Sequence, residues 1–118
     1  MVDPDSLHIG LMRVVLVVPG ARSLKDRRQV VVSLRDRIVA RFPVSCHEVT
    51  RTEHPGRAEL LVTTGGVASH VVREALDRIR SLVDGNPSCV VADVRVQVLA
   101  WSGGAADGWR PAWEDDDV

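Results

Sequence analysis

Hydrophobic positions along the chain follow two different periods, and the switches between these periods mark six secondary-structure elements. The segment His8–Val18 is apolar on both faces of a strand, and over Cys89–Leu99 one aliphatic face alternates with a more polar one, which is the period of a β-strand. Apolar side chains recur every three or four positions over Leu24–Phe42 and Ala68–Val83, which is the period of an amphipathic helix. Two shorter strands are predicted between the helices, over Val44–Arg51 and Arg57–Thr64.

The first and last strands differ in the composition of their two faces. Both faces of the first strand are largely apolar, as is typical of a central strand, and Arg13 is its one marked polar position. One face of the last strand is aliphatic, and we assign to it Val90, Ala92, Val94, Val96 and Val98. The opposite face of the sheet is expected to stay open and to carry Arg13, Glu59, Asp93, Arg95 and Gln97.

The order of the elements is βαββαβ, which is the split βαβ pattern. Right-handed crossovers place both helices on the same side of the sheet, with the first and third strands in its centre. We therefore predict an α+β fold, a ferredoxin-like sandwich with a four-stranded antiparallel sheet and two helices on one face. Residues 1–100 are expected to form this single domain, and residues 101–118 a flexible, acidic, Trp-containing tail.

The start of the first helix is well defined in the sequence. Pro19 and Gly20 end the first strand, because Pro lacks an N–H donor and Gly tolerates a positive φ. Ser23 and Asp26 have the spacing of a capping box, in which the Ser23 hydroxyl accepts from the Asp26 N–H and the Asp26 carboxylate reaches back to the Ser23 N–H. The helix is therefore expected to begin directly after Ser23.

The formal net charge of −1 hides a segregation of charge along the chain. Residues 20–41 contain seven basic and two acidic side chains, which gives +5, whereas residues 114–117 are all acidic. Val32 and Val39 lie between the arginines on a predicted exposed row of this helix. The row is either a solvated face whose long stems cover the edge of the core or a binding surface. The predicted nucleic-acid or anion-binding residues are Arg22, Lys25, Arg27, Arg28 and Arg35.

Little in the sequence points to catalysis. Cys46 and Cys89 lie among apolar residues, so we interpret both as buried side chains and not as nucleophiles. No metal-ligand spacing occurs, so neither a metal nor a cofactor is predicted. Gly65-Gly66 lacks the pattern of a phosphate-binding loop, and the sequence favours a non-enzymatic protein. Without a leader or a long apolar run, the chain is expected to be cytoplasmic and to have no membrane partner.

A resemblance to a known family is carried mainly by residues around the first turn. His8-Ile-Gly-Leu-Met-Arg13 followed by Pro19-Gly-Ala-Arg-Ser-Leu-Lys-Asp-Arg-Arg28 resembles the YlxP-like family of bacterial proteins of unknown function, and the similarity runs over roughly residues 7–99. Supporting positions are Arg41-Phe42, Val44-Ser45 and Glu48-Val49. The resemblance implies a compact ferredoxin-like domain. Genes of this family commonly lie among genes for translation initiation and ribosome assembly, which implies an RNA or ribosome partner. The chain departs from the family pattern at Gly65-Gly66 and in its tail.

Three classes of function fit these observations. The first is a non-enzymatic accessory factor associated with RNA or the ribosome; since the two central strands lack aromatic residues to stack bases, its contacts would be electrostatic and come from the first helix. The second is a homo-oligomeric regulatory or interaction module, a homodimer in its simplest form. Its interface would use the open sheet face, at Ile9, Leu11, Val15 and Val17. The third is an enzyme with an unrecognised site.

The C-terminal tail has two interpretations of its own. The tail holds all three tryptophans of the chain, Trp101, Trp109 and Trp113, which are spaced by Gly, Ala and Pro residues and precede the acidic run 114–117. Such a composition is typical of a disordered, solubilising end. Alternatively, the acidic residues cover the basic helix, with a tryptophan docked against Val32 and Val39.

Overall fold

Six elements follow one another in the computed structural model, which describes residues 6–102 of the chain. Their order matches the six periodic segments of the sequence. Their bounds are β1 Leu7–Val17, α1 Leu24–Arg41, β2 Ser45–Glu48, β3 Arg57–Gly66, α2 Ser69–Asp84 and β4 Val90–Trp101. The second strand is therefore only half as long as the sequence predicts.

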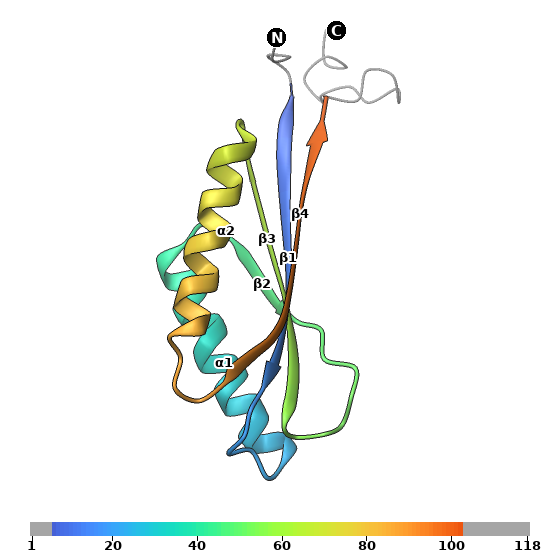
Figure 1. Cartoon of the computed structure of the whole chain (residues 1–118), viewed down its shortest axis with the longest axis vertical. Coiled ribbons are helices and arrows are strands. Elements are labelled where there is room, and N and C mark those ends of the chain that lie inside the picture. The colour runs from blue at the N-terminus through green and yellow to red at the C-terminus, as the bar shows by residue number, and fades with distance from the viewer. Residues whose placement is uncertain (1–5, 103–118) are drawn as a thin grey trace, which may run out of the picture.

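The four strands form one antiparallel sheet in the order β2-β3-β1-β4, so β1 and β3 are central, as predicted. Both helices cover the same face of this sheet (Figure 1). α2 packs mainly on β1 and β4, and α1 packs mainly on β2. The α+β, ferredoxin-like fold is thus confirmed.

The core lies between the sheet and the two helices and is aliphatic. Met12 and Leu16 of β1 and Leu34 and Ile38 of α1 are fully buried there, together with the apolar stripe of α2. α2 comes especially close to β1 at Gly10, where an added Cβ atom would overlap the side chain of Val72. Each fully buried large aliphatic side chain contributes about 1.5–3 kcal/mol. The buried residues of the helices recur every three or four positions, as the helix period predicts: Val31, Leu34 and Ile38 in α1, and Val72, Leu76, Ile79 and Val83 in α2.

A β-bulge in β4 corrects one assignment made from the sequence. Val15 of β1 pairs with Asp93, but the next residue, Leu16, pairs with Val91, so that Ala92 is an extra residue in the ladder. Strict alternation places Val90 and Ala92 on the helix-facing side of β4. Because the bulge inserts one residue, Val90 and Val91 lie on the opposite faces of the sheet from those that strict alternation assigns to them. Val91 packs against the core and Val90 is exposed, the reverse of the prediction.

The sheet face opposite the helices carries the polar residues predicted for it. Arg13 pairs directly with Arg95 of β4, and Glu59 pairs with Val15. Like charges directly opposite each other repel, and each arginine has an acidic partner: Arg13 lies 3.1 Å from Glu59, and Arg95 lies 3.3 Å from Asp93. The connection between β2 and β3 swings out on this same side of the sheet (Figure 1).

Candidate nucleic-acid or anion-binding site

The cap of α1 fixes where its basic side chains begin. Ser23 adopts an extended conformation, and its hydroxyl accepts a hydrogen bond of 3.1 Å from the Asp26 N–H. The carboxylate of Asp26 accepts from the N–H of Arg22 at 2.9 Å, and not from that of Ser23 as the capping-box pattern predicts. The helix start after Ser23 is confirmed, and Arg22 lies exposed in the turn that precedes it.

The five predicted site residues do not share one face of α1. At 100° per residue, Arg27 falls on the same side as Val31 and Leu34, which is the side that faces the sheet. Only 13% of its side chain is exposed. Lys25 and Arg28 are exposed, because their positions turn them away from the sheet. Arg27 is therefore separated from the two basic residues beside which it lies in the sequence.

The guanidinium group of Arg27 is held by groups within the protein. Its Nη1 atom donates to the backbone oxygens of Thr52, His54 and Arg57, at 2.7, 3.0 and 3.4 Å. Its Nε atom lies 3.9 Å from the carboxylate of Glu48. These contacts tie the first turns of α1 to the end of β2 and to the connection that follows it. A binding role for Arg27 stays a prediction, since its donors already have acceptors.

A hollow of about 780 Å³ runs along the outer face of α1. Val32 and Ala40 contribute apolar surface to it, Lys25 lines its first turn, and Arg28 and Arg37 flank it on opposite sides. Within residues 6–102, none of these three basic side chains has a hydrogen bond or an ion pair. The three positive charges are therefore available to an anion.

Arg37 is not among the binding residues predicted from the sequence. Arg28 and Arg37 are nine residues apart, half a turn around the helix, and the hollow spans the outer half between them. The sequence does contain a signal for Arg37, because the polar face of this helix is wide enough to include both Arg28 and Arg37. Asp36 also lines the hollow and lies 3.5 Å from Arg35. Arg35 itself lies outside the lining of the hollow.

Arg35 lies on the side of α1 that faces β2. Its charge acts on the Cys46 thiol, whose pKa is raised to about 11 because burial penalises the thiolate, an effect that Arg35 partly offsets. Burial also raises the pKa of the Cys89 thiol. Both cysteines are buried, and both thiols are therefore protonated at neutral pH and poor nucleophiles. This agrees with their interpretation as buried side chains.

The predicted interface residues on the open sheet face have different environments. Ile9 and Val17 are exposed and Leu11 is half-buried, but Val15 is only 4% exposed. Arg13 lies two residues from Val15 on the same face and reaches diagonally to Glu59, the partner of Val15, so the ion pair lies beside the valine. Sequence alternation reports the face of Val15 and carries no signal for this neighbouring ion pair.

The most continuous apolar surface of the open face lies at the end of the sheet. Leu7 pairs with Trp101, and Ile9 pairs with Leu99. These four side chains are 42%, 37%, 42% and 42% exposed, respectively. We call this group the end patch. Of its members, only Ile9 belongs to the interface predicted from the sequence.

Other classes of site find less support in the described part of the chain. Residues 6–102 contain no group of three or more His, Cys, Asp or Glu side chains placed to hold a metal ion. Neither α1 nor α2 combines the length and the apolar character that a membrane-crossing helix needs.

Comparison with known proteins relates the chain to one family model. Residues 9–96 match the model described as "Protein of unknown function (DUF503)", and this range includes the whole of α1 and its hollow. No curated protein matches the sequence. Among solved structures, the chain is similar to "De novo designed protein Foldit4", with 14% sequence identity and a TM-score of 0.44, over 78% of this chain and 96% of that chain.

Proposed function

This chain belongs to the DUF503 family of proteins of unknown function, and we propose that it binds structured RNA, such as ribosomal RNA, through the outer face of α1. The binding face consists of Lys25, Arg28 and Arg37 around the hollow, with Arg22 in the turn before the helix. The resemblance to YlxP-like proteins implies a ribosome partner. That implication remains a prediction, and the proposal made here agrees with it.

One observation carries the proposal: three exposed basic side chains surround one hollow, and none has an acidic partner within residues 6–102. With Asp36 included, the lining has three basic groups against one acidic group, a charge of +2. Each guanidinium can donate two parallel hydrogen bonds to a phosphate. Neutralising phosphates releases counterions, so affinity should fall steeply as salt rises.

The outer face of α1 also suits a nucleic-acid backbone better than exposed bases. Its lining contains no aromatic side chain on which a base could stack. Val32 and Ala40 lie between Arg28 and Arg37 in this lining, so the two guanidinium groups stand on either side of a short apolar strip. We therefore expect binding that depends on RNA shape and charge more than on base sequence.

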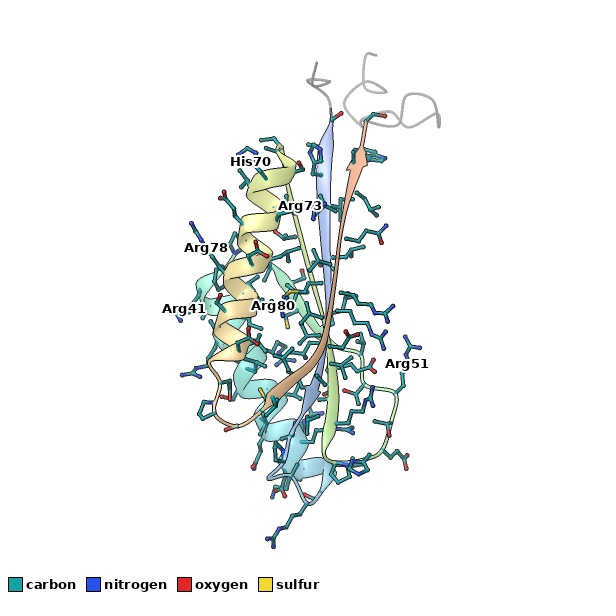
Figure 2. All side chains as sticks on the ribbon, viewed as in Figure 1. Arg41, Arg51, His70, Arg73, Arg78 and Arg80 are labelled. Atoms are coloured by element: carbon teal, nitrogen blue, oxygen red, sulfur yellow. The ribbon has the colours of Figure 1, made fainter. Side chains whose placement is uncertain are left out.

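The test compares two triple substitutions with equal changes in net charge. Lys25→Gln/Arg28→Gln/Arg37→Gln removes the binding face, whereas Arg73→Gln/Arg78→Gln/Arg80→Gln removes three exposed charges from α2 (Figure 2). Binding to a structured RNA hairpin and to isolated ribosomal subunits is measured at about 50 and 200 mM salt. Loss of three phosphate contacts should lower the slope of log affinity against log salt by roughly 2 to 3.

The α2 variant should bind nearly as the parent does. Equal losses in both variants would indicate attraction to net charge alone and would contradict a specific face on α1. A parent chain that binds neither RNA nor subunits at low salt would refute the proposal altogether.

A second candidate function, a homodimeric interaction module, is favoured by the end patch. Its four neighbouring side chains expose apolar area on adjacent strands, and exposed patches of this kind often mark protein interfaces. The interface we propose for this alternative is therefore the end patch, and not a surface centred on Val15.

A further inference from the structure

The edge of the sheet has a notch where β2 is shorter than β3. β2 pairs with β3 only from Ser45–Thr63 to Glu48–Leu60, whereas β3 continues to Gly66. Thr64–Gly66 therefore have no strand partner on the β2 side within residues 6–102. Successive residues of a strand turn their N–H and C=O groups to opposite sides, and Glu59 turns its groups toward β2, since its oxygen accepts from the Val49 N–H at 2.9 Å. Six residues further along the same ladder, Gly65 therefore turns its N–H and C=O toward the notch. Unpaired backbone groups at a sheet edge readily accept an added strand.

Beside this unpaired edge lies a hollow of about 580 Å³. Its apolar walls come from the end of α1 and the turn into β2, at Val39, Phe42 and Val44, and Gly65 of β3 lines its other side. Val39 is 44% exposed, although it lies next to apolar neighbours. Volumes of roughly 300–1,000 Å³ are typical of sites for small molecules, so the hollow can receive one large side chain. Together, the edge and the hollow form a site for an extended segment with an apolar anchor.

The chain leaves β4 at the same end of the sheet as this notch (Figure 1). Leu99 and Gly65 are both register partners of Ile9, on its two sides. With strands about 4.8 Å apart, they lie about 10 Å from each other. The strand ends two residues after Leu99, so the chain departs on the order of 15 Å from the notch.

We propose that residues 109–113 of this same chain, Trp-Arg-Pro-Ala-Trp, dock in the notch. The six residues 103–108 consist of Gly, Ala and Asp, and a flexible linker of six residues spans about 12–15 Å. That span matches the distance to the notch. The segment runs antiparallel to β3, because it arrives from the end at which β3 stops.

The chemistry of the segment fits the site. Trp109 arrives first and supplies the aromatic anchor for the hollow beside Val39 and Phe42. Pro111 cannot donate to a ladder, so the added strand ends there. The four acidic residues 114–117 then follow near the basic end of α1, where Arg35 and Arg41 lie on either side of Val39 in the sequence. Apolar fit and charge complementarity therefore select the same segment.

The proposal of docking does not rest on the proposed RNA binding and has its own test. Amide hydrogen exchange at Gly65, whose N–H faces the notch, is measured in the full-length chain and in three variants: Trp109→Ala/Trp113→Ala, Val39→Glu and, as a matched control, Val71→Glu. Val39 and Val71 are both exposed on helices, so neither substitution disturbs the core. We expect exchange at this edge to be about tenfold faster in the first two variants than in the parent. The control should exchange as the parent does.

Equal exchange in the parent and the double tryptophan variant would overturn the proposal. So would protection that grows with protein concentration, because the notch would then be filled by a second copy of the chain. Faster exchange in Val71→Glu as well would show general destabilisation and would also count against the site. Protection that is independent of concentration and lost in both notch variants supports docking within one chain.

Discussion

At the scale of single residues, position around the helix decides what an arginine does. Arg27 and Arg28 are neighbours in the sequence, but Arg27 faces β2 and donates to three carbonyl oxygens, whereas Arg28 is exposed beside the hollow. The sequence could have separated them, because Arg27 lies four residues before Val31 and seven before Leu34, on the core stripe. It could not have shown the carbonyl groups that accept from Arg27, which belong to residues 25 to 30 positions further along the chain.

We predict that Arg27→Gln destabilises the protein and that Arg28→Gln does not. The substitution removes the charged donor from the backbone oxygens of Thr52 and His54. A hydrogen bond to a charged group stabilises a protein by about 1.5–3 kcal/mol. The free energy of unfolding, measured in urea, should fall by about that amount for Arg27→Gln. Substitution of exposed Arg28 should change it by no more than about 0.5 kcal/mol. Indistinguishable midpoints for the two variants would show that the contacts of Arg27 add nothing to stability.

At the scale of elements, the bulge at Ala92 shows the limit of alternation as a guide. Alternation assigns Val90 to the core side of β4, but Val90 and Val91 are equally apolar, so either of them can occupy a core position. β1 decides the matter: Leu16 is fully buried and pairs with Val91, which brings Val91 to the core. The extra residue Ala92 lets β4 keep the pairing of residues 93–101 with β1 and also place Val91 against the core.

We predict that deletion of Ala92 is tolerated and that deletion of Val96 is not. Without Ala92, Val91 still pairs with Leu16 and Asp93 with Val15, so every other residue keeps its face. Removal of Val96 shifts the register of the strand on one side of the gap and turns its apolar residues to the wrong face. Circular dichroism and thermal melting should show a folded Ala92 deletion and a largely unfolded Val96 deletion. Equal loss of structure in both would mean that the bulge itself is required.

At the scale of the whole molecule, the two faces of the sandwich offer different surfaces. The helix side presents the hollow on α1 with its basic rims, and the opposite side presents paired charges at Arg13 and Arg95 and the end patch beyond them. A basic surface and an apolar surface on opposite sides could serve two partners at once. A homodimer formed through the end patch would cover the apolar surface and leave the basic surface exposed.

If the end patch is a dimer interface, Ile9→Glu and Leu99→Glu should each give a monomer. Each places a charge on the outer face of the sheet without disturbing the helix-facing core, since both side chains are exposed. Size-exclusion chromatography with light scattering would measure the mass of the parent, of both variants and of Val71→Glu as the control. A monomeric parent, or variants that keep the mass of a dimeric parent, would rule out this interface.

Local patterns in the chain predict the order of the elements, the fold class, the helix stripes that face the core and the start of α1. Each of these depends on residues a few positions apart, because strand and helix periods and the Ser23–Asp26 cap are local properties. Four other features become visible only in the folded chain: the bulge, the partners of Arg27, the burial of Val15 and the notch beside β3. Each of those depends on pairing between distant segments; Arg13 and Glu59, for example, are 46 residues apart. No local pattern encodes such a contact, because it forms only when separate elements pack together.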